Sequence, residues 1–427
     1  MKDIPAFLHI FTLLNPSNRA QTVAGSDEYY LKMEYDFDEI IRREGSGCIK
    51  YDEPQAKGKL PLWVADMDFA TPPFIMDALR ERLSHPVLGY PTVPSDYYPM
   101  ISRWIKYLHG WDVRSGHIRY VPGIVKGIGI ALNCFLDKGD KVVIQPPVYH
   151  PFRLVPKKNG FEVLLNPLVP TEENGILTGY RMDLDGLESL LDREKDARAL
   201  ILSNPQNPAG ICWTVEELTR LADICEKHGV LVISDEIHCE MAHKGFRHHP
   251  FASVSEQASR CSITFMAPSK TFNIAGVVSS YAVIPETPLR ERYFKYLEAN
   301  ELDYPTIFAI TATQAAYRYG KEWREQMLDY VEGNIAYLDH FLRENIPSIH
   351  CMKPQASFLA WLDFRALGLT HDELIDLVEN KAGLLLNDGA MFGAEGEGFF
   401  RINLGCPRAT LEKALQKLGS AISSREN

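Results

Sequence analysis

Three polar side chains, Asn207, Asp235 and Lys270, each lie a few residues past an apolar run that is typical of a buried strand. Burial disfavours the ammonium form of a lysine, which lowers its pKa and makes the amine a nucleophile or a base. Such amines commonly form a Schiff base with an aldehyde cofactor. A buried carboxylate is costly unless it meets a cation. The pattern therefore indicates covalent cofactor chemistry at Lys270. A solvated loop lysine is the alternative for Lys270, and a helix cap or a structural ion pair is the alternative for Asp235.

The turn that carries Asn207 is stiff. It reads Asn-Pro-Gln-Asn-Pro-Ala-Gly over residues 204–210. Proline fixes its own backbone dihedral and restrains the residue before it. The two Asn-Pro steps therefore predict an asparagine amide held rigidly toward a ligand, and an ordinary turn is the alternative.

Strand-like and helix-like stretches alternate along the middle of the chain. We expect strands at 141–145, 161–165, 199–203, 230–234, 262–266 and 281–284, and helices at 183–191 and 214–228. This alternation favours an α/β fold with a mostly parallel sheet covered by helices on both faces. Such sheets bind ligands beyond the carboxyl ends of their strands, where the three polar side chains stand.

The length of 427 residues exceeds one ordinary core, so two domains are expected. The larger α/β domain is predicted to cover 76–315. A smaller, discontinuous α+β domain is predicted from 33–75 and 316–427, with a long helical stretch that begins near Thr306. Residues 1–32 are predicted to be an N-terminal tail or extension, because their composition differs from the rest.

Composition excludes several classes. The count of 45 Lys and Arg against 56 Asp and Glu gives a net charge of −11, and no basic stripe is present, so no nucleic-acid partner is expected. No apolar run reaches the ~18 residues of a membrane span. The eight cysteines lack C-x-x-C spacing and are typical of free thiols in a cytoplasmic protein.

Four histidines follow Asp235 closely, at positions 238, 243, 248 and 249. Their spacing matches no helical or ribbon zinc site. We therefore predict no metal there, and an exposed loop for His238, His243, His248 and His249.

The stretches SNPQNPAG, SDEIH and APSKTFNIAG, in this order and at these intervals, resemble the fold-type I pyridoxal-phosphate (PLP) enzymes of the class I/II aminotransferase family. The resemblance runs from Met33 to about Leu418 and implies a PLP-dependent transferase-like large domain. WVADMDFATPP, GYP, PPVYHPF and RINLGCPR narrow it to the MalY/PatB branch of cystathionine β-lyases and cysteine-S-conjugate β-lyases. It implies a PLP-dependent carbon–sulfur β-lyase that cleaves cystathionine or related cysteine S-conjugates to a thiol, pyruvate and ammonia. A PLP-dependent aminotransferase is the alternative, and a regulator with residual activity is less favoured.

The resemblance also implies residue roles around the cofactor ring. Lys270 would be the Schiff-base lysine and later proton carrier, and Asp235 would pair with the pyridine nitrogen. Asn207 would hydrogen-bond the ring hydroxyl, and Tyr149 would stack on the ring. His238 stands where many relatives have a tyrosine, so it would contact the same oxygen or support Asp235.

At the two ends of the ligand the resemblance implies anion-binding groups. Ile124 and Val125 open an apolar helix whose free amides would bind the phosphate together with Ser269. An ordinary helix start is the alternative for the first two. Tyr90 would reach the phosphate from a neighbouring subunit, which implies a homodimer. Arg401 would clamp the α-carboxylate of the substrate with two hydrogen bonds.

Overall fold

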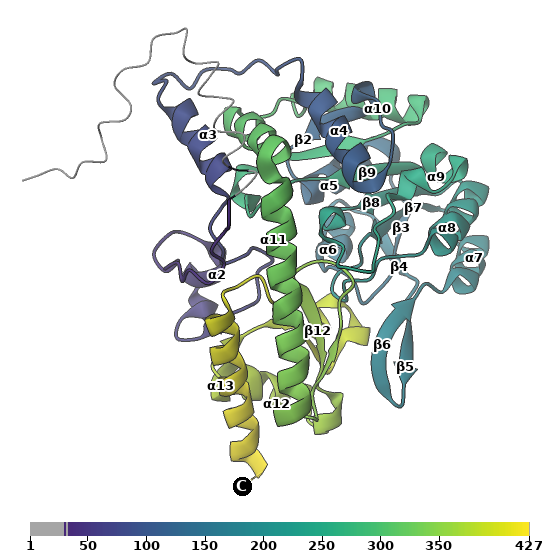
Figure 1. Ribbon diagram of the computed structural model, residues 1–427. Helices are drawn as coiled ribbons and strands as arrows, with labels where there is room; N and C mark the ends of the chain where they lie inside the picture. The colour runs from purple at the N-terminus through teal and green to yellow at the C-terminus, as the bar shows by residue number, and fades with distance from the viewer. Residues whose placement is uncertain (1–29, 31–32, 427) are drawn as a thin grey trace, which may run out of the picture.

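The computed structural model describes residue 30 and residues 33–426. The tail predicted at 1–32 therefore lies, apart from Tyr30, outside the described residues. Figure 1 shows a body with a large sheet and its helices at the upper right and a smaller sheet below, with α11 (Ile307–Asn345) running along both.

A seven-stranded sheet forms the centre of the upper part, in the order β2-β10-β9-β8-β7-β3-β4. Its strands are β2 (Ile118–Val121), β3 (Lys141–Ile144), β4 (Glu162–Leu165), β7 (Ala197–Ser203), β8 (Leu231–Asp235), β9 (Ser262–Met266) and β10 (Ser280–Val283). Pairing is parallel except for β10, which runs antiparallel to β2 and β9. The predicted mostly parallel sheet is confirmed, and β2 is an additional strand.

Helices cover both faces of this sheet, as expected for nearly continuous apolar strands. They are α5 (Ile124–Phe135), α6 (Pro151–Lys158), α7 (Leu184–Arg193), α8 (Val215–His228), α9 (Glu256–Arg260) and α10 (Thr287–Ala299). Strand residues alternate between the two layers: Leu200 packs in the cluster that includes α7 and α8, and Ile201 packs in the cluster that includes α5 and α10. Thr214 and Glu217 form the reciprocal capping box that opens α8.

The lower part contains a four-stranded antiparallel sheet in the order β11-β12-β15-β14. Its strands are β11 (His350–Met352), β12 (Leu359–Asp363), β14 (Asn387–Asp388) and β15 (Phe399–Asn403), with α12 (His371–Ile375) and α13 (Arg408–Glu426) beside them. A short parallel pair, β1 (Leu60–Pro61) with β13 (Leu384–Leu385), ties the N-terminal segment to this part.

The remaining helices pack near the top and the left of Figure 1. They are α2 (Ile49–Asp52), α3 (Pro73–Leu83) and α4 (Tyr97–His109), and α3 and α4 both contact α11. Positions 75 and 316, the edges of the predicted domains, fall inside α3 and α11. The domain boundaries stay a prediction.

A hairpin of β5 (Val169–Glu173) and β6 (Ile176–Arg181) projects from the body in Figure 1 and was not predicted. Asn174 and Gly175 make its turn, both with positive φ, 52° and 78°. An Asn-Gly pair is the preferred type I′ hairpin turn, so the sequence carried a signal for this element.

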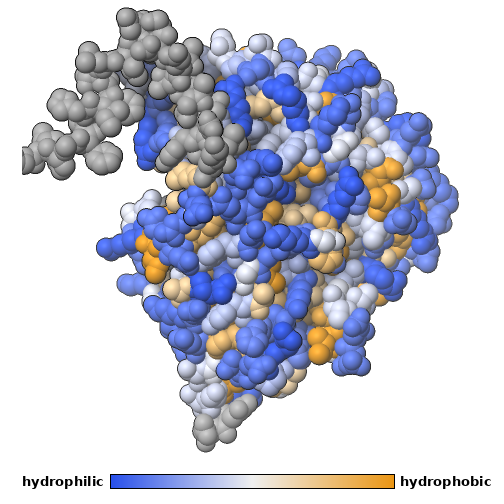
Figure 2. Space-filling view, in the orientation of Figure 1, coloured by the Kyte–Doolittle hydropathy of each residue, from blue (hydrophilic) through white to orange (hydrophobic). Residues whose placement is uncertain are grey.

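Surface features agree with a folded acidic protein. Figure 2 shows hydrophilic residues over most of this face, with small separate apolar patches. All eight cysteines lie in the described part and are unpaired. Among the helices that the structure describes, none is long and apolar enough to cross a membrane.

Candidate active site

A cavity of about 270 Å³ lies beyond the carboxyl ends of β7, β8 and β9. This is the edge at which ligands bind in sheets of this kind. Nearly all the predicted site residues line the cavity: Ile124, Val125, Tyr149, Asn207, Asp235, His238, Ser269 and Lys270. Arg401 contacts one of these residues, and Tyr90 lies elsewhere.

Lys270 has the environment of a reactive amine. Its Nζ donates a 2.6 Å hydrogen bond to the carbonyl oxygen of Ala65. Burial lowers the pKa of Lys270 to about 8, with the positive charge of Arg401 acting in the same direction and Asp66 and Asp235 opposing it. Near neutral pH a useful fraction of this amine is therefore unprotonated and able to attack an aldehyde.

Asp235 ends β8 with its carboxylate in the cavity. Its Oδ1 accepts a 3.1 Å hydrogen bond from the Ile237 amide. Within the described residues, Asp235 forms no salt bridge. Burial raises the pKa of Asp235 to about 7. A protonated ring nitrogen in the cavity would supply the missing cation and favour the carboxylate form.

Arg401 is a buried cation without a carboxylate partner in the described part of the chain. Its Nη1 donates to Oδ1 of Asn207 at 2.8 Å, and its Nη2 donates to Oδ1 of Asn387 and to the carbonyl oxygen of Trp63. Its Nε is buried without an acceptor, and burial lowers the pKa of Arg401 to about 10. The guanidinium thus fits an incoming carboxylate.

The start of helix α5, which lines the cavity, fits a phosphate. Helix α5 begins at Ile124 after Gly123, whose φ is 108°. The first amide bonded inside this helix is that of Gly127, which donates to the Gly123 carbonyl oxygen. The amides of Ile124 and Val125 precede it and lie at the positive end of the helix dipole. Ser269 adds a buried hydroxyl.

His238 and Tyr149 also line the cavity. Nδ1 of His238 lies 3.0 Å from Oγ of Ser357, and burial lowers the pKa of His238 to about 3, which keeps the imidazole neutral. The Tyr149 amide donates to the carbonyl oxygen of Asn207 at 3.1 Å. This bond joins the aromatic residue to the Asn-Pro turn, so their positions are coupled.

The exposed loop predicted for the histidines is wrong for His238, His243 and His248, which are 4%, 5% and 2% exposed. The segment after β8 folds inward: Nε2 of His248 lies 2.8 Å from the buried carboxylate of Glu236. Across residues 30 and 33–426, no group of three His, Cys, Asp or Glu is arranged to hold a metal.

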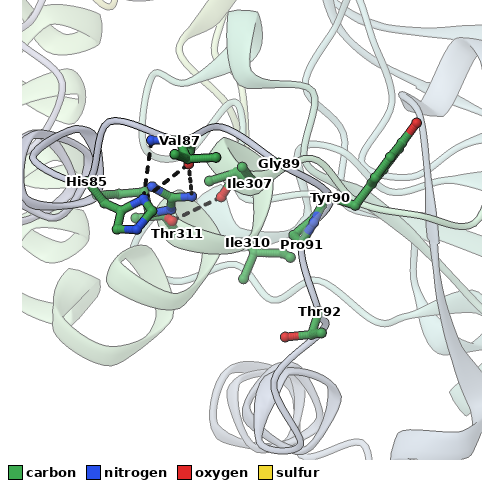
Figure 3. Close-up of a pocket in the computed structure, with 10 residues that line it drawn as sticks. His85, Val87, Gly89, Tyr90, Pro91, Thr92, Ile307, Ile310 and Thr311 are labelled. Carbon is green, nitrogen blue, oxygen red and sulfur yellow. Dashed lines mark hydrogen bonds between the residues drawn. The ribbon is translucent and has the colours of Figure 1, made fainter.

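Tyr90 is placed away from the Lys270 cavity. It is fully exposed and borders a separate hollow between residues 82–92 and α11. Figure 3 shows its ring extending away from the other residues of that hollow, including Ile310 and Thr311. Within one chain, Tyr90 and Lys270 are therefore not brought together.

Several site contacts lie outside the predicted set. The carbonyl of Ala65, the amide of Asn387 and the hydroxyl of Ser357 each hold a predicted residue. None of them stands at a strand end of the large sheet. Ala65 stands in the stretch WVADMDFATPP, which carries part of the family resemblance, but no role was predicted for it. No local pattern marks Asn387 or Ser357, because long-range packing brings them to the site.

Comparison with known proteins agrees with this geometry. The family model for class I and II aminotransferases matches residues 57–418. The chain belongs to the class I and II aminotransferase family. This confirms the family expected from the three sequence stretches.

Within this family, the chain is 40% identical to the protein named cystathionine beta-lyase PatB of Bacillus subtilis, over 91% of this chain and 100% of the relative. A PLP-bound putative aminotransferase from Clostridium difficile is 40% identical, with a TM-score of 0.87 over 91% of this chain and 100% of that one. A PLP-bound C-S lyase from Staphylococcus hominis is 32% identical, with a TM-score of 0.85 over 92% and 99%.

Proposed function

We propose that this protein is a PLP-dependent carbon–sulfur β-lyase that cleaves cystathionine or related cysteine S-conjugates to a thiol, pyruvate and ammonia. The observation that carries the proposal is the buried Arg401 guanidinium, which lacks a carboxylate partner and is bonded to Asn207 at the cavity of Lys270. An amino acid whose α-carboxylate pairs with Arg401 would hold its α-carbon within the cavity. The names of PatB and of the Staphylococcus hominis lyase support the same reaction class.

The cavity residues fit PLP in one orientation. The amides of Ile124 and Val125 and the Ser269 hydroxyl would hold its phosphate, and Asp235 would hold its ring nitrogen. Because Oδ1 of Asn207 already accepts from Arg401, the amide NH2 of Asn207 is left to donate to the ring hydroxyl.

Tyr149 would cover one face of the ring, and neutral His238, fixed by Ser357, would lie beside the ring oxygen or Asp235. When bound, PLP withdraws electrons from the substrate α-carbon. Lys270 would hold the cofactor covalently and then accept the α-proton on its Nζ.

Elimination completes the proposed reaction. The bond between the β-carbon and sulfur breaks as the α-proton moves to Lys270, and the sulfur leaves with the electron pair and takes a proton to become a thiol. Water then releases the remaining three-carbon fragment as pyruvate and ammonia. Transamination is the second candidate, because a relative of equal identity is named a putative aminotransferase.

We further propose a cytoplasmic homodimer. Apolar side chains are exposed on the segment between α3 and α4, including Val87, Leu88 and Tyr90, at 61%, 56% and 105%. Such exposure is typical of a surface that a second chain covers. In this dimer, Tyr90 of the partner subunit would reach the phosphate end of the cavity. The eight unpaired cysteines favour a reducing compartment.

The direct test supplies the purified protein with PLP and cystathionine, and separately with an amino donor and an oxo acid. Release of equal amounts of pyruvate and thiol in the first reaction is expected, with slow or no formation of new amino acid in the second. Formation of amino acid without thiol release would support the aminotransferase instead.

A further inference from the structure

Residues 63–68, called here the cover segment, pass beside the Lys270 cavity, which Ala65 lines. The Ala65 carbonyl oxygen accepts the 2.6 Å hydrogen bond from Nζ of Lys270. The Trp63 carbonyl oxygen accepts from Nη2 of Arg401 at 3.1 Å. One short segment therefore sets the positions of both the amine and the guanidinium.

Two asparagines hold the backbone of the cover segment. Nδ2 of Asn403 donates to the carbonyl oxygens of Val64 and Asp66, both at 2.6 Å. Oδ1 of Asn273 accepts from the Met67 amide at 3.0 Å, and its Nδ2 donates back to the Met67 carbonyl at 2.9 Å. These bonds fix the main chain, but they leave the side chains of the segment to be placed by other groups.

The acidic side chains of the segment are held by two cations from the N-terminal region. Arg43 forms a two-pronged ion pair with Asp66, at 2.7 and 3.1 Å, and contacts Asp68 at 2.6 Å. Lys50 is fully buried and pairs with Asp68 at 2.8 Å. The Arg43 side chain is 16% exposed, so its ion pairs are only partly screened by water.

This cluster keeps a negative charge out of the cavity. Ala65 lines the cavity that Lys270 lines, whereas its neighbour Asp66 does not and points its carboxylate at Arg43. A free carboxylate beside a buried amine would stabilise the ammonium form and remove the nucleophile.

We propose that Arg43 is a positioning residue for Lys270: by holding the Asp66 carboxylate away from the cavity, it leaves the amine facing the neutral carbonyl of Ala65. The consequence for turnover rests on the proposed function, but the state of the amine can be measured without any cofactor or substrate. Neither Arg43 nor Asp66 touches the reacting atoms in this account.

The charges around Lys270 set the direction of the effect. The charge of Asp66 acts on the amine from the cover segment although the carboxylate is held by Arg43, that of Arg401 acts from β15 and that of Asp235 from β8. Neutral His238 lines the same cavity. Asp66 already raises the pKa of Lys270 while paired with Arg43. Loss of Arg43 would leave this carboxylate with only the 3.8 Å contact to Nζ of Lys50 and would raise the pKa of Lys270 further.

The test measures the ionisation of Lys270 in the apoprotein. Competitive acetylation across a range of pH, with the Lys270 peptide quantified by mass spectrometry, gives the midpoint for the wild type and for Arg43→Gln. We expect the midpoint in the variant to rise by about half a pH unit or more. In Arg43→Lys, which keeps the positive charge, the midpoint should lie close to the wild-type value.

Asp66→Asn should move the Lys270 midpoint in the opposite direction from Arg43→Gln. Without the carboxylate the midpoint should fall, and the double variant of Arg43→Gln with Asp66→Asn should lie between the single variants. If Arg43→Gln does not fold, the Asp66→Asn result decides alone. A midpoint that stays at the wild-type value in the folded variants overturns the proposal.

Lys141→Gln is the matched control, because Lys141 is 18% exposed and pairs with Glu194 at 2.6 Å outside the cavity. It should lower stability without moving the Lys270 midpoint. An equal movement in this control would overturn the proposal by showing a general structural effect. Since no substrate is used, the Lys270 midpoints can be measured and interpreted even if the protein has no lyase activity.

Discussion

Nη1 of Arg401 donates a 2.8 Å hydrogen bond to Oδ1 of Asn207, which joins the residue proposed for the substrate carboxylate to the one proposed for the cofactor ring. The bond crosses between β15 of the smaller sheet and the turn after β7 of the larger sheet. It therefore couples the position of Arg401 to that of Asn207, and in the proposed reaction it would help to set the distance between the substrate and the cofactor.

Arg401→Ala should mainly raise KM, because it removes a contact made in both the ground state and the transition state. The expected loss is on the order of 2–4 kcal/mol in kcat/KM. Arg401→Lys should recover part of the lost kcat/KM, since a lysine keeps the positive charge but not the two parallel N–H groups of the guanidinium. Steady-state kinetics check this, with the cofactor absorbance retained. A normal KM for every amino acid tried would place the carboxylate clamp elsewhere.

Lys270→Ala should lower kcat by about a thousandfold or more, because both the covalent attachment of the cofactor and the proton carrier are lost. PLP should still bind in part through the amides of Ile124 and Val125 and through Asp235. Fluorescence titration measures the binding. In the wild type, borohydride should fix the cofactor on Lys270, and a label on another lysine would contradict the assignment. Lys244→Ala, at an exposed lysine paired with Asp329, is the control.

Asp235 should give the apoprotein a specific pH dependence. Its pKa is about 7 when folded, against an ordinary value of 3.8, so the folded state keeps a proton that the unfolded state has lost between these pH values. Its contribution to the free energy of unfolding is present below about pH 4 and is lost as the pH rises through about 7. The Asp235→Asn variant has no carboxyl group at this position, so it should not lose this stability as the pH rises.

Chemical denaturation from pH 4 to 8 measures this effect as a difference. The stability of the wild type relative to Asp235→Asn should fall across this window by on the order of 1–3 kcal/mol. The difference is needed because His238 and His248, whose pKa values burial lowers to about 3, act with the opposite sign below about 6.5. A difference that does not vary with pH would refute the buried, protonated Asp235.

Shared sites in the proposed dimer can be tested by mixing inactive subunits. A Tyr90→Ala chain and a Lys270→Ala chain each lack one residue of every site in their own homodimers. A hybrid dimer contains one site with Lys270 from the first chain and Tyr90 from the second. Random exchange should restore about a quarter of the wild-type sites. Exchange demonstrated by mass spectrometry without any recovered activity would contradict the shared site.

Much of the site could be predicted because its main residues stand beside regular elements. Asn207, Asp235 and Lys270 follow strands with strong apolar runs, and parallel strands bring their carboxyl ends to one edge. The family stretches added Tyr149 and Arg401. The roles of these residues are still proposals, whereas their common location is observed, with Arg401 reaching it through Asn207.

The contacts that escaped prediction depend on tertiary packing. The Ala65 carbonyl accepts from Lys270 although the two residues are 205 positions apart in the chain. Secondary-structure propensity and hydrophobic periodicity are local and cannot predict such a contact. His248 was expected in an exposed loop, because the spacing of the four histidines matches no zinc site. Its pairing with the buried Glu236 reversed that expectation.

The β-lyase assignment is tested most directly by following both products of one reaction. Protein loaded with PLP is given cystathionine, and pyruvate and free thiol are measured together over time. A β-lyase should release the two in equal amounts and at equal rates, and Lys270→Ala should yield neither. Consumption of cystathionine without thiol release, accompanied by amino-group transfer to an added oxo acid, would contradict it.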